Sequence, residues 1–543
     1  MVESRSCEEI AKRLGALPIV GGVLAKLRVR QIIDGLCPIR EKVADYTHGQ
    51  IAEILIANRL TAPHPLYRFD LWAQEFAAPE LFGVNAKKLN DDRLGRTLDA
   101  LADKVDEIQI ATSMAAVESY GLSLDKVHLD ITSFMFEGAY EEQDADPRLP
   151  VVKRGYNAEK DFKRRQVRTG QAVIGDGGIP LYHKVFSGNQ TDSTTLMKVF
   201  EGLEFLRSKA KPKELIHVGD SKLLSAGNLL FLQQRGVFFV GPGERRHEFD
   251  EEVSALDPTA WVELSYASES EVLKRKKAPK EEWNRYWCQE IAASVRDPKT
   301  GKEFPYRKLY IRSSEEVRAA TKNRDRQMRR TQEELQKVAN GIPRYYKTKQ
   351  QIENKVSSIL EARGVAQFIK ATVSEHDGRP HLEWHRDELA LEKAAKVMGC
   401  YPLLTNLSED RTAKDVLAIQ KDQYRVERRF ADWKGPLEVC PVFLHSNRRI
   451  VGLMLITALA LMIFCLIERQ VRREIGDKDG YAVGFLGERR KSRPTGSSIF
   501  YVLRVLTAIT FKGKPGINRV LNIPPLVERI LDVFQVNLEQ IVS

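Results

Sequence analysis

The spacing of apolar residues changes several times along the chain, and each spacing predicts a different kind of element. Up to about Tyr120 apolar residues recur at helical spacing, most clearly in residues 51–60 and 93–119. Pro63 and Pro65 interrupt this pattern and end the first of these helices. Residues 1–120 are therefore predicted to form a helical N-terminal domain, which could bind DNA or could hold two copies of the chain together.

From Gly121 onward the period changes to two. The segment KVHLDITSFMF, residues 126–136, reads as a strand with one apolar and one polar side. The apolar side consists of Val127, Leu129, Ile131 and Met135, and the polar side of His128, Asp130 and Thr132. Aspartate is depleted in strands, so Asp130 is a candidate site residue, although a partly exposed strand aspartate without function fits the pattern equally well.

A hairpin, a helix and a short buried strand that ends at Asp220 follow, and helices and strands continue to alternate. Two glycines after Asp176 predict a tight turn in the hairpin, with Asp176 as a turn former. This order is typical of the α/β class, in which ligands bind near strand ends. If adjacent strands bring Asp130 and Asp220 together, their carboxylates repel unless a cation lies between them. That arrangement predicts a divalent metal with oxygen ligands and favours Mg²⁺.

A third pattern, in residues 412–434, predicts one amphipathic helix with three faces. Its apolar face carries Ile419, Val426, Phe430 and Trp433, its basic face carries Lys421, Arg425, Arg428 and Arg429, and the line between them carries Gln420, Gln423, Glu427 and Lys434. The basic face is a candidate DNA surface. Glu427 is either a solvated residue on an ordinary basic helix or a third carboxylate that joins the two aspartates.

Composition and charge narrow the class of partner. Lys+Arg total 85 against 74 for Asp+Glu, and the net charge of +11 favours an acidic partner such as nucleic acid. The six cysteines lie far apart without a CxxC pair, so neither a disulfide framework nor a structural zinc site is indicated, and a reducing cytoplasm fits. Residues 450–467 are uncharged and approach the length of a membrane span, but without an aromatic belt or a second span they are predicted to form a buried core helix.

These residues carry a resemblance to a known family. Asp130 in HLDITSF, Asp220 in HVGDSK, and Glu427 followed by Lys434 resemble the DDE triad and the E-x6-K part of the Y-x2-R-x3-E-x6-K signature of bacterial insertion-sequence transposases. The segments ELFGVNAKKLNDDRLGRTLDAL, GYNAEKDFKRRQVRTGQAVIGDGG and DWKGPLEVCPVFLHSNRRIVGLML are also similar to that group, so the resemblance spans about residues 17–467. At the other two signature positions this chain has Gln420 and Gln423 in place of Tyr and Arg.

The resemblance implies a ribonuclease-H-like core that is interrupted by a strand-rich insertion. It divides the chain into a first core part at 121–243, an insertion at 244–399, a second core part at 400–475 and a basic C-terminal region at 476–543. Inside the insertion the pattern predicts strands at 286–295, 304–313 and 379–385, and a charged helix over 315–338. That helix is either a solvated arm or a DNA contact.

The implied activity is metal-dependent DNA cleavage at transposon ends, followed by strand transfer into target DNA. Asp130, Asp220 and Glu427 would hold two Mg²⁺ ions, for which Mn²⁺ could substitute, and Lys434 would hold a phosphate. The implied partner is double-stranded DNA, both terminal inverted repeats and target DNA, bound by a homodimer acting at the bacterial nucleoid without a membrane. The alternative is a transposase-derived DNA-binding protein with weakened catalysis.

Two further segments have the composition of nucleic-acid contacts. Residues 273–280, LKRKKAPK, are a basic run, and residues 342–349, IPRYYKTK, combine aromatic rings with cations. Rings stack on unpaired bases and cations bind phosphate, so Tyr345 and Lys347 are candidate DNA contacts.

Overall fold

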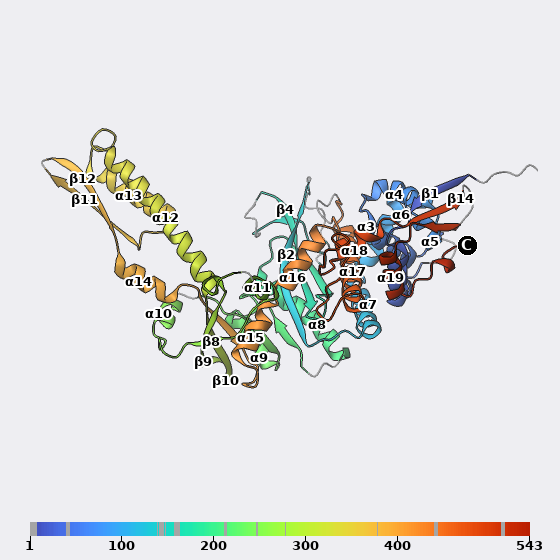
Figure 1. The fold of residues 1–543 in the computed structure, drawn as a ribbon, viewed down its shortest axis with the longest axis horizontal. Coiled ribbons are helices and arrows are strands. Elements are labelled where there is room, and N and C mark those ends of the chain that lie inside the picture. The colour runs from blue at the N-terminus through green and yellow to red at the C-terminus, as the bar shows by residue number, and fades with distance from the viewer. Residues whose placement is uncertain are drawn as a thin grey trace, which may run out of the picture. The chain divides into compact units, whose positions relative to one another are not determined.

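The structure is a computed structural model. It describes residues 8–39, 44–137, 140, 146, 148–156, 163–210, 214–245, 248–276, 278–376, 378–438, 444–511 and 516–542. Residues 157–162, part of the stretch that carries the resemblance, lie outside this description. The chain divides into two compact units, one formed by Met1–Leu223 with Asp422–Ser543 and the other by Leu224–Lys421 (Figure 1). The first unit is therefore built from two segments that are far apart in the sequence.

Helices form the N-terminal part of the first unit, as the sequence predicts. They are α1 (Leu17–Lys26), α2 (Val29–Leu36), α3 (His48–Thr61), α4 (Phe69–Glu75), α5 (Ala78–Phe82), α6 (Asp91–Ala102) and α7 (Val105–Tyr120). A capping box starts α3: the Thr47 side chain accepts from the Gln50 backbone, and the Gln50 side chain accepts from the Thr47 backbone. The helix ends at Thr61, shortly before Pro63, because proline does not continue a helix.

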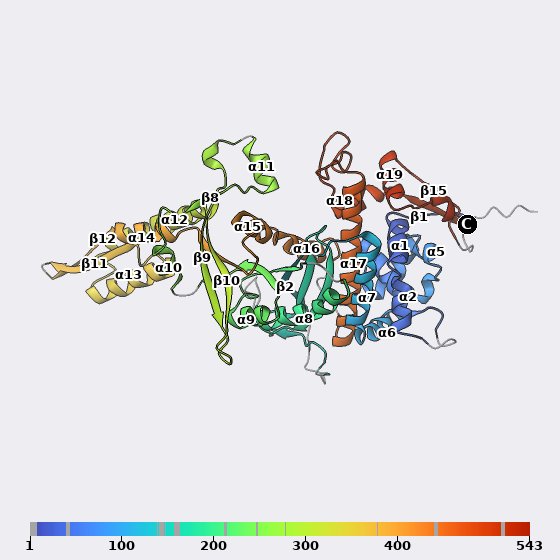
Figure 2. The same ribbon diagram turned by 90° about the horizontal axis from the view of Figure 1, so that it is seen from below.

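The apolar run predicted as a core helix forms α17 (Asn447–Glu474). It is long and apolar enough to cross a membrane by length and composition, but 94% of its most apolar 18-residue window is buried inside the protein. Helices α3 and α6 pack against it, and α6 lies beside α17 in Figure 2. The approach of α6 is close, because a Cβ atom at Gly452 of α17 would lie 2.2 Å from the carbonyl oxygen of Leu98. The core of the first unit is therefore built around α17.

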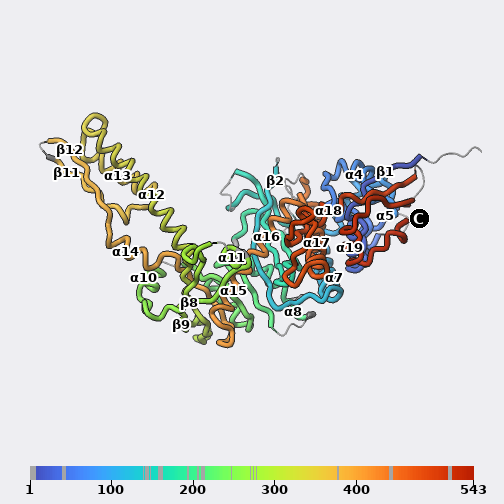
Figure 3. Tube along the Cα trace, viewed as in Figure 1, coloured from blue at the N-terminus to red at the C-terminus, as the bar shows by residue number. Residues whose placement is uncertain are grey.

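The two ends of the first unit meet in a small antiparallel sheet, which the sequence did not predict. β1 (Glu9–Arg13) pairs with β14 (Thr507–Phe511), and β14 pairs with β15 (Arg519–Leu521), so the blue and red ends of the trace lie side by side in Figure 3. The C-terminal region also contains α18 (Gly496–Leu503) and the predicted final helix, α19 (Pro525–Val533). The basic C-terminal region is thus tied to the N-terminal strand.

The α/β part of the first unit is a mixed sheet between two helices. Its strands are β2 (Lys126–Phe136), β3 (Lys153–Arg154), β4 (Arg165–Ile174), β5 (Pro180–Ser187) and β6 (Ile216–Val218). β4 pairs antiparallel with β2 and β5, and β6 runs parallel to β2. α8 (Asp192–Ala210) packs on the face of Ile131 and Gly170, and α16 (Tyr424–Lys434) packs on the face of Phe134. These faces are opposite, because side chains alternate along a strand.

The tight turn predicted after Asp176 joins β4 to β5. Gly177 and Gly178 have φ angles of +74° and +64°, which only glycine adopts without strain. The Asp176 carboxylate accepts two hydrogen bonds of 2.7 Å from Arg469 of α17. Asp176 is therefore a turn residue, as the sequence indicated. An ion pair with Arg469, which is far away in the sequence, holds it in place.

The second unit contains five strands that pair antiparallel to one another. Their order is β7 (Phe238–Pro242), β13 (Cys400–Thr405), β10 (Glu303–Ser313), β9 (Tyr286–Arg296) and β8 (Val262–Leu264). The helices around them are α9 (Ala226–Gln234), α10 (Phe249–Ser254), α11 (Glu269–Arg275), α14 (Glu388–Val397) and α15 (Ala413–Lys421). The strands predicted near 286–295 and 304–313 are confirmed as β9 and β10.

The rest of the insertion forms a lobe with its own apolar core. It consists of α12 (Ser314–Asn340), α13 (Lys349–Arg363) and the hairpin of β11 (Ile369–His376) with β12 (Arg379–Arg386). Leu335, Ile352 and Leu382 from three of these elements are buried in one cluster. α12 confirms the predicted charged helix and β12 the predicted strand, whereas α13 and β11 were not predicted.

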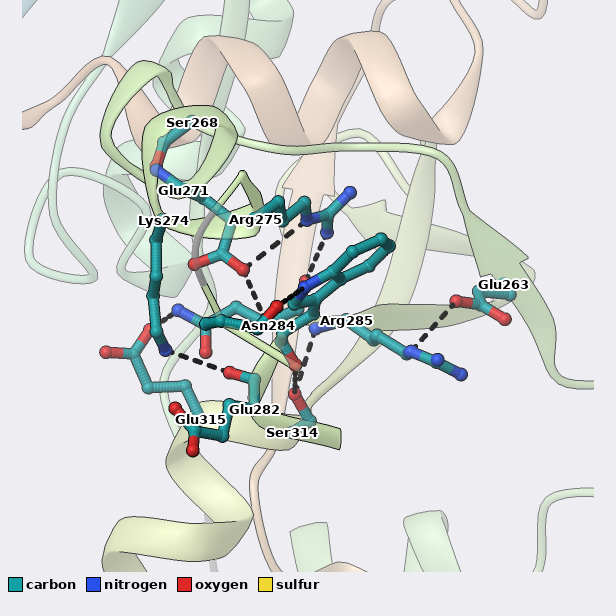
Figure 4. Close-up of polar contacts among 12 residues, drawn as sticks. Glu263, Ser268, Glu271, Lys274, Arg275, Glu282, Asn284, Arg285, Ser314 and Glu315 are labelled. Atoms are coloured by element: carbon teal, nitrogen blue, oxygen red, sulfur yellow. Dashed lines mark hydrogen bonds and ion pairs between the residues drawn. The ribbon is translucent and has the colours of Figure 1, made fainter. Parts of the chain in front are cut away.

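Two cations of the basic run 273–280 are engaged inside the second unit (Figure 4). Lys274 donates to the Glu282 carbonyl oxygen at 2.8 Å, and Arg275 donates to the Asn284 carbonyl oxygen at 2.7 Å. Glu271 accepts from the Asn284 backbone N–H at 2.7 Å. These bonds fix α11 beside the start of β9, so Lys274 and Arg275 have a structural role that the charge pattern did not show.

Replacing Gly452 by alanine should destabilise the first unit. The added methyl group meets the α6 backbone and forces α6 and α17 apart, which costs about 1–3 kcal/mol of unfolding free energy in urea denaturation. Gly35→Ala in α2 is the matched control, because nothing lies within 4 Å of a Cβ there. It should be neutral or stabilising, by up to about 1 kcal/mol. Equal effects of the two changes would contradict the close packing of α6 on α17.

Candidate active site

Asp130 lies on β2, and Asp220 follows the neighbouring strand β6. The parallel β2–β6 register pairs Lys126 with Ile216 and ends at His128 with Val218. Each aspartate comes two residues after this last pair, Asp130 within β2 and Asp220 beyond the end of β6. Paired strands lie about 4.8 Å apart, so the two chain segments that lead to the aspartates start from neighbouring positions. The predicted adjacency of the two strands is confirmed for β2 and β6.

Local bonds hold both aspartates, and both are half-buried. Oδ1 of Asp130 accepts from the Ile131 backbone N–H at 2.7 Å. Oδ1 of Asp220 accepts from the backbone N–H groups of Lys222 and Leu223 at 2.9 and 3.3 Å. The second pattern is that of an aspartate that shapes the turn after a strand. Regular strand geometry ends at Val218, so Asp220 lies in this turn and not in the strand itself.

The single helix predicted over residues 412–434 is wrong, because the chain turns at Asp422 and Gln423. α15 ends at Lys421 and α16 begins at Tyr424. At the break, Asp422 pairs with Lys126 of β2 at 3.3 Å. Helical periodicity continues on both sides of the turn, so the pattern alone does not reveal it. Gln420 therefore does not share a continuous helix face with Glu427.

Contacts at both ends of α16 fix its direction along β2. Near its start, Gln423 donates from Nε2 to the Leu129 carbonyl oxygen at 3.1 Å, and its Oε1 lies 3.2 Å from Nδ1 of His128. Near its end, the Trp433 ring meets the Phe134 ring edge-on with 5.0 Å between centroids. α16 therefore runs in the same direction as β2.

This direction places Glu427 level with Asp130. Glu427 follows Gln423 by four residues, which is about 6 Å along a helix and about two residues along a strand. Starting from His128 and Leu129, the two residues that Gln423 contacts, that step leads to Asp130 and Ile131. Residues four apart share a helix face, so Glu427 lies on the face that Gln423 presents to β2. Lys434 lies on the same side, with Nζ 5.6 Å from the centre of the Phe134 ring.

The three carboxylates do not form a closed metal site. Among the described residues, no group of three or more His, Cys, Asp and Glu side chains is arranged to hold a metal ion. Asp130 lies on β2 and Asp220 just after the neighbouring β6, and both are half-buried, whereas Glu427 on the facing helix α16 is exposed. The three acids therefore come from adjacent elements but differ in their exposure.

The predicted basic DNA face of the helix is partly wrong. Arg429 is buried, with 3% of its side chain exposed, and donates to the carbonyl oxygens of Gly177 and Gly178 and to Glu468. Arg428 is half-buried and also pairs with Glu468, at 3.2 Å. An amphipathic pattern identifies the non-apolar side of a helix, but it does not show that acids elsewhere in the chain cover that side. Arg429 is therefore a structural residue and not a DNA contact.

The other two predicted cations also have partners within the protein. Arg425 pairs with Asp422 at 3.4 Å. Nζ of Lys421 lies 5.2 and 5.5 Å from the ring centres of Tyr286 and Tyr401, and burial lowers the pKa of this lysine. Both side chains are half-buried, so neither forms an open cationic surface.

Tyr345 and Lys347 are exposed, as a nucleic-acid contact requires. They lie between α12 and α13, and Tyr345 has 70% of its surface exposed. The Arg344 guanidinium lies over the Tyr345 ring, 5.2 Å from its centre. This combination of ring and cation is available to solvent, and its role as a DNA contact stays a prediction.

Two residues beside the site were missed in the sequence. Gln171 of β4 is opposite Asp130 in register, and His183 of β5 is opposite Gln171, so all three lie on the face toward α16. The His183 ring meets Trp433 edge-on at 5.8 Å. Gln171 and His183 are both buried. The available signal was one polar residue in each of two apolar segments, Gln171 before AVI and His183 after PLY, but only the strand register aligns them with Asp130.

The two buried histidines on this face should make stability depend on pH. Burial lowers the pKa of His128 and of His183 to about 4, whereas the unfolded chain binds these protons near pH 6.5. As pH falls from about 6.5 to about 4, only the unfolded state gains the protons. The free energy of unfolding should therefore fall by up to about 3 kcal/mol for each histidine.

Urea denaturation at pH 7 and at pH 5 measures this dependence. His183→Gln should reduce the difference between the two pH values, and His385→Gln, at an exposed position of β12, should leave it unchanged. An unchanged difference in His183→Gln would show that this histidine is not its source.

The sequence matches two domain families. Residues 9–115 match a domain of unknown function, DUF4277, and residues 125–463 match the transposase DDE domain. No curated protein matches the chain.

Similar solved structures include the piggyBac transposase synaptic complex with hairpin DNA, with a TM-score of 0.39 and 10% identity over 89% of this chain and 79% of that one. The Mos1 transposase paired-end complex with left transposon end has a TM-score of 0.15 and 9% identity over 37% of this chain and 61% of that one. The Mos1 mariner paired-end complex with Mn has a TM-score of 0.15 and 10% identity over 40% and 65%.

The DDE-domain match covers more than half of the 543 residues and includes Asp130, Asp220 and Glu427. A DDE transposase domain implies phosphoryl-transfer nuclease chemistry with divalent metal ions. The fold is accordingly mixed α/β and ribonuclease-H-like, with a helical N-terminal region before it. The chain therefore belongs to the family of transposases with a DDE domain.

Proposed function

We propose that this protein cleaves DNA at the ends of a mobile element and joins the released ends to target DNA, as an insertion-sequence transposase of the group with the Y-R-E-K signature. The observation that supports the proposal is the position of Asp130 on β2 and of Asp220 just after the parallel neighbour β6, with Glu427 on the helix that packs against β2. Three carboxylates, one from a strand, one from the turn after the adjacent strand and one from a helix, would form the donor set that this reaction needs.

The residues present fit a pair of Mg²⁺ ions. Asp130, Asp220 and Glu427 offer carboxylate oxygens, the donors that Mg²⁺ prefers, and Mn²⁺ would be accepted by the same set. The bound ions would stabilise the attacking and leaving oxygens of the phosphodiester. Asp130 on β2 and Asp220 in the turn after β6 would provide the half-buried part of the set, and Glu427 would complete it when its side chain turns from solvent toward β2.

Lys434 and Gln423 support the same site in different ways. The Lys434 ammonium, seven residues after Glu427 on the side of α16 toward β2, would hold a phosphate of the DNA as a point charge. Gln423 stands where the signature has Arg, and here it bonds to the β2 backbone and to His128. It thereby keeps α16 on β2 through a neutral link, so the absence of the signature arginine leaves the helix in place.

The partner would be double-stranded DNA, at terminal inverted repeats and at the target, held by a homodimer. The exposed Tyr345 and Lys347 in the insertion lobe would contribute to this binding, Tyr345 through its ring and Lys347 through its charge. The helical region 9–115 is a second surface for end recognition or for pairing of protomers.

Asp130→Asn, Asp220→Asn and Glu427→Gln should each reduce Mg²⁺-dependent cleavage of the element's end DNA by at least about 1,000-fold, because each removes one charged oxygen donor. Binding of the same DNA should be retained. Asp125→Asn, at an exposed position at the edge of β2, is the matched control and should cleave normally. Cleavage and joining of labelled end DNA by the purified protein measure all four variants. Full cleavage by a triad variant would remove that residue from the site, and binding without cleavage by the unaltered protein would favour a DNA-binding protein that has lost catalysis.

Tyr345→Ala and Lys347→Ala should weaken DNA binding without abolishing cleavage at saturating DNA. The lysine change should also lower the slope of log affinity against log salt concentration by about 1, because one fewer counterion is released. Lys299→Ala, at an exposed position in the β9–β10 turn, serves as control. Fluorescence anisotropy at several salt concentrations measures the slopes. If Tyr345→Ala and Lys347→Ala have the same DNA affinity and the same salt slope as Lys299→Ala and the unaltered protein, this segment is excluded from the DNA surface.

A further inference from the structure

Glu468, near the C-terminal end of α17, is a fully buried carboxylate that binds four donors. Oε1 accepts from Nη2 of Arg429 at 2.9 Å and pairs with Nη1 of Arg472 at 2.8 Å. Oε2 accepts from Nη2 of Arg428 at 3.2 Å and from the Gly496 backbone N–H at 2.7 Å. The carboxylate therefore ties α16, α17 and the start of α18 to one point.

The charge of Glu468 is maintained by its partners. Burial raises the pKa of a carboxyl group, but the positive charges of Arg429, Arg472 and Arg428 outweigh burial at Glu468 and lower its pKa below the ordinary value. Removal of one partner from such a buried cluster leaves the remaining charges unpaired. Well-packed apolar residues can replace a buried ion cluster without loss of stability, so stability alone does not require this arrangement.

The same cluster extends to the β4–β5 turn. Arg429 donates from Nε to the Gly178 carbonyl oxygen and from Nη2 to the Gly177 carbonyl oxygen, each at 2.7 Å. A Cβ atom at Gly178 would lie 3.1 Å from Nε of Arg429, so the turn needs glycine there for this contact as well as for its φ angle. Arg429 is thus held from two sides, by a carboxylate on α17 and by the backbone of the hairpin.

Arg428 and Arg429 directly follow Glu427. Successive residues of a helix are related by a fixed rotation of about 100°, so anchoring these two side chains sets the direction in which Glu427 projects. We propose that Glu468 is a positioning residue of the active site, which acts through Arg428 and Arg429 to fix the rotation of α16 and so the direction of the Glu427 carboxylate relative to Asp130. This inference rests on the proposed role of Glu427 as a metal ligand.

Metal binding tests this role separately from activity. Mn²⁺ binding to the DNA-free protein is measured by electron paramagnetic resonance, and cleavage of end DNA is measured over a range of Mg²⁺ concentrations. Glu468→Gln should weaken Mn²⁺ binding and raise the half-saturating Mg²⁺ concentration by about 10-fold or more, as loss of a supporting residue does at other metal sites. DNA binding should be retained, and excess metal should restore part of the cleavage.

Asp176→Asn is the matched control. It removes the ion pair by which Arg469 of α17 holds the hairpin turn, but does not touch Arg428 or Arg429. It should lower the melting temperature and leave Mn²⁺ affinity unchanged. If Glu468→Gln does not fold, Arg428→Gln replaces it, because the half-exposed arginine is one of the two ties and should give a smaller weakening in the same direction.

The outcomes separate the two proposals. The positioning role is overturned if Glu468→Gln binds Mn²⁺ with wild-type affinity while Glu427→Gln binds it more weakly. The same criterion applies to Arg428→Gln where that variant replaces Glu468→Gln. Wild-type Mn²⁺ affinity in Glu427→Gln itself overturns the assignment of Glu427 as a ligand, and the positioning role falls with it. Equal loss of Mn²⁺ affinity in Asp176→Asn and Glu468→Gln would show a general effect of loosening the turn and would also overturn the positioning role.

Discussion

Three arginines share one buried carboxylate where α16, α17 and the β4–β5 turn meet, and the arrangement of the site depends on that interaction. The apolar anchors of α16 are Val426, Phe430 and Trp433, and apolar burial is non-directional. Directional bonds to Glu468 and to two turn carbonyls supply the missing constraint. Arg428 and Arg429, on the cationic side of the helix, therefore form bonds within the protein.

The central position of α17 explains how a sheet and a helical region that are far apart in sequence form one unit. Its apolar run is covered by α3 and α6, which belong to the N-terminal region, while its last turns hold α16 and the hairpin. Burial of this long apolar surface favours bringing the N-terminal and C-terminal segments together. The sheet of β1, β14 and β15 then joins the two ends. The insertion lobe does not depend on the burial of α17, because α12, α13 and the β11–β12 hairpin have an apolar core of their own.

Gln423, which stands where the Y-R-E-K signature has Arg, makes contacts that explain why a neutral side chain fits this position. Its Nε2 donates to the Leu129 carbonyl oxygen, and its Oε1 accepts from Nδ1 of His128 in the tautomer that carries a hydrogen on Nδ1. Burial lowers the pKa of His128 and so favours the neutral ring. A neutral amide suits a buried neutral partner better than an unpaired guanidinium would. Gln423 is therefore matched to the environment in this chain, and it joins α16 to the same strand that carries Asp130.

The sequence by itself determined the elements whose side-chain period is decided locally. Period two revealed the strand of Asp130, a long apolar run revealed α17, and glycines after Asp176 revealed the turn, because each signal comes from backbone geometry or from burial of neighbouring residues. Tertiary structure decided the break at Asp422, the burial of Arg429, and the row of Asp130, Gln171 and His183. Those features depend on partners 12 to 296 positions away, and a periodic pattern contains no information about which acid or strand elsewhere in the chain will cover a given face.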